Sequence, residues 1–149
     1  MPQAWVLVTG ATGFIGQHLI CALLAQDFYV LGLTRQKHKK SDHANLFWVS
    51  DLSEITQTKI DYVINLAGEN IGASRWTDAR KQQLIASRVG TTQVLLNWLR
   101  EQNIQPKRII SGSAVGFYGI DPSEQWQKSC TEQDSPQAIF VSDLCQQWE

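Results

Sequence analysis

The sequence lacks an apolar run long enough to cross a membrane, and its first residues lack the basic-then-apolar layout of a signal peptide. Its three cysteines stand at unrelated spacings with no Cys-x-x-Cys pair, which argues against both a disulfide framework and a zinc site. The formal net charge of −1 also lacks the basic footprint of a nucleic-acid binder. We therefore expect a cytoplasmic protein with reduced thiols, no metal centre, and neither membrane nor nucleic-acid partners.

The most informative feature that the sequence does contain is a glycine-rich stretch, TGATGFIG, at residues 9–16. An apolar run precedes it and a helical pattern begins at Phe14, so the order is strand, tight turn and helix start. Glycine lets the backbone come close to a nucleotide pyrophosphate, and a helix start offers free N–H groups and the positive end of its dipole. Glycines also mark ordinary turns, but both flanking elements of a dinucleotide-binding fingerprint are present here. The candidate contacts are Gly10, Thr12, Gly13, Phe14, Ile15 and Gly16.

Strands and helices alternate along the chain, which predicts an α/β fold: a doubly wound, Rossmann-type parallel sheet of about five strands with helices on both faces. After the first strand, apolar runs predict strands at residues 29–34, 46–49, 61–66 and 108–111. Helical spacing predicts helices over 14–26, from Thr77 onward and from Phe140 onward. The first helix should bury Ile15, Leu19, Cys21, Ala22 and Leu23, and the second Ile85, Val89, Leu96 and Leu99.

The end of the second predicted strand indicates which dinucleotide binds. An acidic residue there would bind the adenosine ribose hydroxyls, whereas a neutral residue followed by arginine accommodates a 2′-phosphate. The chain has Thr34 and Arg35, which predicts NADP(H) rather than NAD(H), with Arg35 as the contact. Lys37, Lys39 and Lys40 follow in a loop, where a solvated charge run is the simpler interpretation.

The Gly-x-x-Gly-x-x-Gly spacing resembles the cofactor loop of the extended short-chain dehydrogenase/reductases. The segment 68–92 resembles one atypical subgroup of this family, the epimerase family proteins, which are also described as nucleoside-diphosphate-sugar epimerases. The resemblance is carried by its Gly-Glu, Arg-Trp-Thr, Ser-Arg and Gly-Thr motifs. The resemblance covers essentially the whole chain but only about half of a family member. It implies that residues 1–149 are an incomplete NADP(H)-binding domain, the N-terminal half of a longer protein whose C-terminal substrate domain is absent from this chain.

The resemblance implies further contacts at the strand ends. An Asp-Leu pair after the third strand would meet the adenine, although such an Asp is also an ordinary cap. The Asn-x-Ala-Gly pattern after the fourth strand would let the backbone pass the cofactor, although Asn65 could instead stabilise the sheet. Arginines in the segment after it could hold a substrate phosphate or carboxylate, while Lys81 fits a polar helix face. The residues concerned are Asp51, Leu52, Leu66, Ala67 and Gly68 for the cofactor, and Arg75 and Arg88 for the substrate.

A hydroxyl cluster follows the fifth predicted strand, and ligands of open parallel sheets sit outside the carboxyl ends of the strands. In the resembled family a Ser or Thr here donates to the substrate oxygen. Ser113 is the first candidate, and Ser111 is the next and a candidate cofactor contact. The count to Tyr118 differs by one residue from the usual family spacing, so the choice of serine stays open.

The family's Tyr-x-x-x-Lys pair, in which the lysine lowers the pKa of the phenol, is missing. The matching helix offers Phe140 with Leu144, or Val141 with Cys145. If the protein is an enzyme, Tyr118 with Ser113 must move the proton. We therefore predict an NADP(H)-binding epimerase-like or reductase-like protein acting on a sugar nucleotide or small carbonyl, or alternatively an NADP(H)-binding sensor or interaction module. An incomplete sheet would leave an unpaired edge, through which the chain could self-associate.

Overall fold

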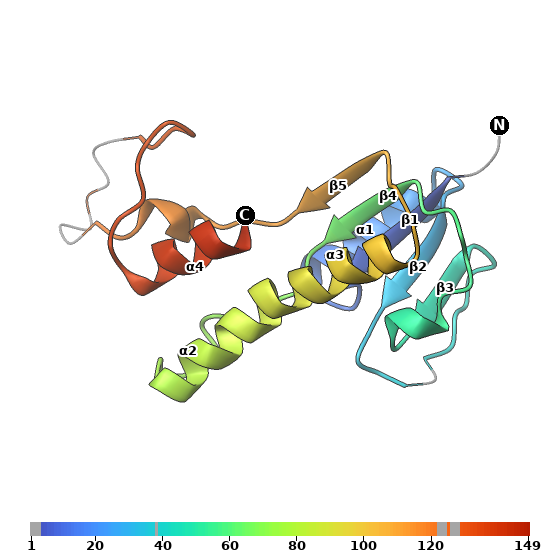
Figure 1. Ribbon diagram of the computed structural model, residues 1–149, viewed down its shortest axis with the longest axis horizontal. Helices are drawn as coiled ribbons and strands as arrows, with labels where there is room; N and C mark the ends of the chain where they lie inside the picture. The colour runs from blue at the N-terminus through green and yellow to red at the C-terminus, as the bar shows by residue number, and fades with distance from the viewer. Residues whose placement is uncertain (1–3, 38, 122–124, 126–128) are drawn as a thin grey trace. The chain divides into compact units, whose positions relative to one another are not determined.

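The computed structural model describes residues 4–37, 39–121, 125 and 129–149. The chain forms two compact units, the sheet unit (Met1–Gly112) and the C-terminal unit (Ser113–Glu149) (Figure 1). The sheet unit contains β1 (Trp5–Thr9), α1 (Phe14–Leu24), β2 (Tyr29–Leu33), β3 (Leu46–Val49), the 3₁₀ turn η1 (Leu52–Glu54), β4 (Tyr62–Asn65), α2 (Asp78–Ile85), the π-helical turn η2 (Ala86–Gly90), α3 (Thr91–Glu101) and β5 (Arg108–Ser111). The C-terminal unit contains the 3₁₀ turn η3 (Val115–Tyr118) and α4 (Phe140–Trp148).

The described strands form one parallel sheet in the order β3-β2-β1-β4-β5. The chain therefore builds outward from β1 through β2 to β3, and then returns to the other side of β1 for β4 and β5. The strand order reverses between β1 and β4, which is where open α/β sheets bind their ligands. This arrangement confirms the α/β, Rossmann-type fold that the alternating pattern predicts.

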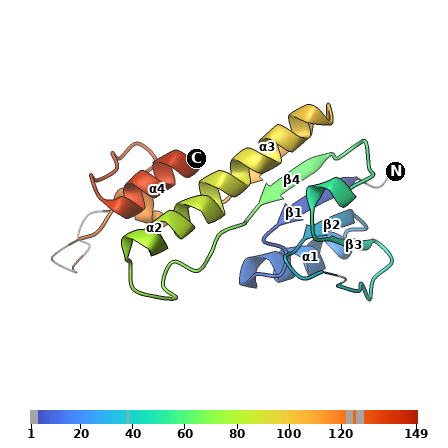
Figure 2. The ribbon, with the colours of Figure 1, turned by 60° about the horizontal axis from the view of Figure 1, so that its bottom comes forward.

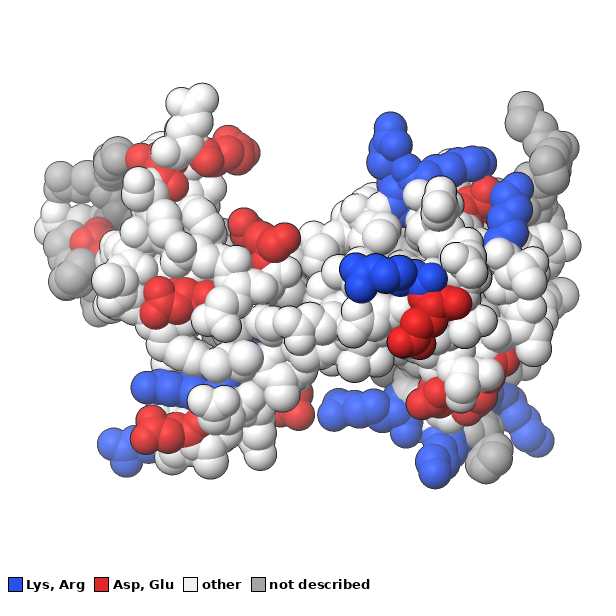
Figure 3. Space-filling model, viewed as in Figure 1, with Lys and Arg blue, Asp and Glu red and all other residues white. Residues whose placement is uncertain are grey.

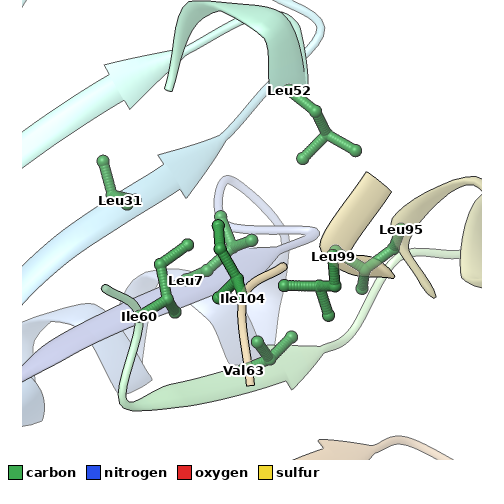
Figure 4. Packing of buried hydrophobic residues seen from close by; sticks show 8 residues of the cluster. All are labelled: Leu7, Leu31, Leu52, Ile60, Val63, Leu95, Leu99 and Ile104. Atoms are coloured by element: carbon green, nitrogen blue, oxygen red, sulfur yellow. The ribbon is translucent and has the colours of Figure 1, made fainter. Parts of the chain in front are cut away.

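Apolar side chains on both faces of the sheet explain why its strands are nearly continuous hydrophobic runs. Successive residues of β1 point to opposite faces, so Val6 and Val8 pack with Ile20 of α1, whereas Leu7 packs with Leu95 and Leu99 of α3. Figure 2 shows α1 and α3 on opposite faces of the sheet. Figure 4 shows the α3-side cluster, which consists of Leu7, Leu31, Leu52, Ile60, Val63, Leu95, Leu99 and Ile104.

Helix α1 buries a different face from the one predicted, because its glycine is pressed against the turn that precedes it. A Cβ on Gly16 would lie 2.9 Å from the Cα of Ala11, so only a residue without a side chain fits there. Gly16 and Ile20 are the buried residues of the helix. This phase turns Ile15 outward, 64% exposed, and leaves Cys21 and Ala22 exposed, so these three burial predictions are wrong.

The second helix also departs from its predicted stripe. The structure buries Leu84, Leu95 and Leu99, whereas Leu96 is 39% exposed and Ile85 is only half-buried. The π-helical turn η2 separates α2 from α3 and interrupts the 3.6-residue period. A single stripe drawn from residue 85 to residue 99 therefore could not follow both helices.

A buried carboxylate joins the amino ends of two neighbouring strands. Asp61, just before β4, accepts a 3.0 Å hydrogen bond from the backbone N–H of Trp5. The ammonium groups of Lys107 and Lys59 lie 3.0 and 3.6 Å from its other oxygen. The Trp5 hydrogen bond and then the Lys107 ammonium lower the pKa of Asp61, and in turn Asp61 raises the pKa of Lys107.

The C-terminal unit is held together by contacts between α4 and η3. The hydroxyl of Ser142 donates to the carbonyl oxygen of Gly116 at 3.0 Å, and Ser142, Leu144 and Cys145 are the buried residues of α4. The side-chain amide of Gln137 bonds both the N–H and the carbonyl of Ile120. Within the described ranges, every helix is too short or too polar to span a membrane.

Candidate functional site

The glycine turn between β1 and α1 forms a cradle at the carboxyl end of the central strand. Gly10 has a positive φ of 62°, and a Cβ there would overlap the carbonyl oxygen of Leu66 and lie 2.6 Å from its carbonyl carbon. The N–H of Gly13 donates to the carbonyl of Gly10 at 2.9 Å, which closes the turn. Gly13 is the N-cap of α1 and offers no side chain to the first N–H groups of the helix. The turn therefore packs tightly on its own backbone and leaves the first N–H groups of α1 without a side-chain cap.

Exposed apolar side chains border this helix start. Phe14 and Ile15 are both exposed, and together with His18 and Leu19 they line a shallow hollow of about 450 Å³. The ring of Phe14 packs against that of His18 with centroids 5.1 Å apart. Thr12, in the turn, is exposed as well. Of the contacts predicted in the glycine-rich stretch, Thr12, Gly13, Phe14 and Ile15 are thus exposed to a ligand.

A buried polar network lies behind the strand ends. Thr9 donates to the side-chain oxygen of Asn65 at 2.6 Å, and the N–H groups of Leu66 and Ala67 both donate to the Thr9 hydroxyl at 3.1 Å. The Asn65 amide donates in turn to the hydroxyls of Thr92, at 2.8 Å, and Ser111, at 3.3 Å. These contacts stabilise the sheet, which is the alternative role that the sequence left open for Asn65. They fix Leu66 and Ala67 beside the glycine turn, and the roles of Thr9 and Thr92 could not be read from their local sequence.

The carboxyl ends of β2 and β3 border a second hollow. Thr34 is buried and its hydroxyl accepts from the N–H of Gln36, whereas the side chain of Arg35 is 92% exposed. The ammonium of Lys39 lies 4.9 Å above the ring of Trp48. The hollow, of about 460 Å³, is lined by Gln36, Lys37, Lys39, Trp48, Val49, Ser50 and Glu54. Two of the loop lysines thus belong to a concave surface, and Trp48 joins them as a residue that the sequence reasoning missed.

Asp51 and Leu52 have local structural roles. The Asp51 carboxylate caps η1 by accepting from the N–H and the hydroxyl of Ser53, at 2.8 and 2.6 Å, and these bonds lower its pKa. The side chain of Leu52 belongs to the α3-side core. A ligand could therefore meet Leu52 only through its backbone, while the adenine contact of Asp51 stays a prediction.

Arginines from the helices hold the loop that follows β4. Arg88 donates to the carbonyl oxygen of Glu69 at 2.9 Å, and its guanidinium lies so close to Gly68 that a Cβ there would be 3.1 Å from it. Arg80 pairs with the Glu69 carboxylate and donates to the carbonyl of Asn70 at 2.8 Å. Arg75 is exposed. The structure thus brings Arg88, but not Arg75, to this loop. It adds Arg80, which the sequence reasoning did not select, and Glu69, which that reasoning used only for the family resemblance.

The hydroxyl candidates divide between the two units. Ser111 belongs to the sheet unit and accepts from Asn65, whereas Ser113 and Tyr118 belong to the C-terminal unit. The Ser113 hydroxyl donates to the carboxylate of Glu149. Burial, and then the negative charge of Glu132, raise the pKa of Tyr118. The C-terminal unit carries six acidic residues and one lysine in its sequence, and acidic side chains predominate on it in the view of Figure 3.

The chain is similar to known proteins in both sequence and structure. The model of the NAD dependent epimerase/dehydratase family matches residues 6–140. The epimerase family protein YfhF of Bacillus subtilis is 34% identical over 149 residues, which cover 97% of this chain and 48% of that protein. The crystal structure of human epimerase family protein SDR39U1 (isoform 2) with NADPH is similar with a TM-score of 0.77 and 27% identity, over 97% of this chain and 47% of that one.

A nucleoside-diphosphate sugar epimerase from Corynebacterium glutamicum is similar with a TM-score of 0.69 and 27% identity, over 98% of this chain and 29% of that one. The chain thus spans about half the length of its B. subtilis and human relatives, and less of the third. Because the family match extends over most of the sequence, from β1 to the start of α4, the chain belongs to the NAD dependent epimerase/dehydratase family.

Proposed function

We propose that this chain binds NADP(H) and belongs to an epimerase-like or reductase-like protein acting on a sugar nucleotide or a small carbonyl compound. The observation that carries the proposal is the glycine cradle. Gly10 holds a positive φ against Leu66, and Gly16 leaves no room for a Cβ against Ala11. Such a cradle ahead of an uncapped helix fits a pyrophosphate, which needs close backbone approach and free N–H donors. When bound, the dinucleotide would supply hydride donor or acceptor chemistry.

The strand ends on either side of the cradle suggest the direction of the dinucleotide. The adenosine end would lie toward β2 and β3, where the hollow with Trp48 is found, and the exposed Arg35 would pair with the 2′-phosphate. Thr34 has no carboxylate, so this position lacks the acidic group that would bind the adenosine ribose hydroxyls. The opposite end would lie toward β4 and β5, beside Ser111. The NADPH in the human relative, at 27% identity, supports this choice of cofactor.

A cofactor titration tests the proposal directly. Fluorescence titration should give a dissociation constant at least about tenfold lower for NADPH than for NADH, because only NADPH offers a phosphate to Arg35. Arg35→Ala should remove this preference and leave NADH affinity unchanged. Lys40→Ala, a matched loss of charge in the same loop, should keep it. Equal affinities of the wild-type protein for the two cofactors would overturn the NADP(H) assignment.

For the reaction, the sequence offers Ser113 and Tyr118 in place of the missing Tyr-x-x-x-Lys pair. A phenol with an ordinary pKa, about 10, is already protonated at neutral pH, and burial raises the pKa of Tyr118 further, so it is better suited to donate a proton than to accept one. The sugar-nucleotide substrate class is supported by the name of the C. glutamicum relative. The prediction is tested by assaying sugar nucleotides and small carbonyl compounds with NADPH, using the full-length protein: Tyr118→Phe should abolish any turnover that the wild type shows.

The second candidate is an NADP(H)-binding sensor or interaction module. It is favoured by helix α4, in which the positions of the catalytic pair are taken by Phe140 with Leu144 or Val141 with Cys145, and both Leu144 and Cys145 are buried. Neither pairing offers a lysine to a phenol. Tight NADPH binding with no turnover across the substrate panel would favour this candidate, and measurable turnover would exclude it.

A further inference from the structure

Glu69 is a carboxylate with two arginine partners that come from different parts of the sheet unit. It lies in the loop after β4, and one of its oxygens pairs with Arg80 of α2. The other oxygen is 3.8 Å from the guanidinium of Arg35, which follows β2. Neither the family pattern nor the cofactor reading above assigns a function to this carboxylate.

The Arg35–Glu69 contact crosses the carboxyl end of β1. Strands β2 and β4 pair with opposite edges of β1, so the contact spans two strand spacings, about 9.5 Å. The glycine turn begins at that same strand end, with Gly10 packed against Leu66. A dinucleotide that runs from the β2 end to the β4 end must pass this point. The ion pair therefore lies beside the path that the cofactor is proposed to take.

The two members of the pair differ in how firmly they are held. Glu69 is one-third exposed, and its backbone N–H donates to the hydroxyl of Ser87 at 3.1 Å while its carbonyl accepts from Arg88. Its partner Arg80 is only 12% exposed. Arg35, in contrast, is 92% exposed and meets Glu69 at the long distance given above. Arg35 is therefore the member that can move, and Glu69 is the fixed one.

We propose that Glu69 is a specificity-determining residue, which holds Arg35 when no 2′-phosphate is present and releases it when NADP(H) binds. This inference rests on the proposed NADP(H) binding. A dianionic phosphate outcompetes one carboxylate for an exposed guanidinium, because it offers more charge and more acceptor oxygens. With NAD(H), which has no such phosphate, Arg35 stays on Glu69. The carboxylate thus lowers the affinity for the phosphorylated cofactor and leaves that for NAD(H) unaffected.

Glu69→Gln tests the exchange, because the amide oxygen can still accept from Arg80 while the charge that holds Arg35 is lost. NADPH should bind about two- to fivefold more tightly, as expected for removal of an exposed ion pair, and NADH affinity should not change. In an Arg35→Ala background the same substitution should have no effect on NADPH. Glu101→Gln, an identical charge change at the end of α3, is the matched control and should alter neither affinity.

A measurement on the wild-type protein keeps the inference testable if Glu69→Gln does not fold. Nitrogen-15 NMR of the arginine side chains should show the Arg35 guanidinium signal moving on addition of NADPH and not of NADH. Unchanged or weakened NADPH binding by folded Glu69→Gln, or an Arg35 signal that responds equally to both cofactors, overturns the exchange. If wild-type protein binds NADPH and these tests fail, only this inference falls, whereas a wild type that does not bind NADPH overturns the proposed function as well.

Discussion

The sheet unit and the C-terminal unit support their candidate residues in different ways. In the sheet unit the candidates stand on strand ends and on a helix start that two layers of core hold from both faces. In the C-terminal unit Tyr118 stands on a 3₁₀ turn that packs on a single helix. The first unit therefore offers the packed support that a preorganised binding site needs, and it contains all the proposed cofactor contacts. The second unit carries Ser113 and Tyr118, the candidates for the proposed reaction.

The largest effect that would sharpen this contrast comes from Gly10→Ala. The positive φ and the overlap with Leu66 should destabilise the protein by about 3 kcal/mol and abolish NADPH binding. Chemical denaturation and cofactor titration measure the two effects. Gly90→Ala is the control, because a Cβ there meets nothing within 4 Å, and it should stabilise the helix by about 0.5–1 kcal/mol. Equal stability and binding in the two variants would show that the turn is not a tight cradle.

A smaller effect is expected at the amino ends of the central strands β1 and β4. Asp61→Asn loses the ionic part of its contacts with Lys107 and Lys59 and should reduce the free energy of unfolding by about 1 kcal/mol at pH 7. Because folding lowers the pKa of Asp61, its contribution is fully present above its unfolded pKa, about 3.9, and is lost as the pH falls through the lower, folded value. Denaturation curves of both proteins should thus converge in acid. A gap that persists at low pH would contradict this origin.

The third effect concerns association and not stability. We propose that two copies of the chain associate through β5, which pairs only with β4 among the described strands and exposes Ile109 and Ile110, the latter by 59%. Sedimentation analysis should show concentration-dependent dimerisation that Ile110→Lys prevents. Val94→Lys, on an equally exposed apolar residue of α3, should leave it intact. A wild-type chain that stays monomeric at every concentration would refute the proposal.

The smallest effect, on NADPH affinity, is expected from Tyr118→Phe. A large effect would contradict the contrast drawn between the two units. The phenol belongs to the C-terminal unit, so its loss should leave NADPH affinity unchanged in an equilibrium titration. A clear loss of affinity would mean that this unit takes part in holding the cofactor, and the division between binding and reaction would no longer stand.

Local sequence patterns were sufficient for much of the fold. The apolar runs predicted β3 and β5 with their observed bounds, although all four residues of β5 are exposed at the edge of the described sheet. The same patterns failed for the helix faces at Ile15, Cys21 and Leu96. The phase of α1 depends on the packing of Gly16 against Ala11, and that of α3 follows a π-helical turn. Neither feature leaves a periodic signal, so neither could be predicted from spacing.

The sequence by itself determined the glycine turn, the neutral residue before Arg35 and the absence of the Tyr-x-x-x-Lys pair, because each is a matter of which residue types stand at which spacing. Only the tertiary structure decided what these residues touch. It made Asn65 the centre of a buried network and brought Glu69 to Arg35 across the end of β1. Arg35 and Glu69, 34 positions apart, meet because a parallel sheet brings the carboxyl ends of its strands to the same side. Which strand ends become neighbours depends on the order of the strands, and local sequence patterns do not reveal that order.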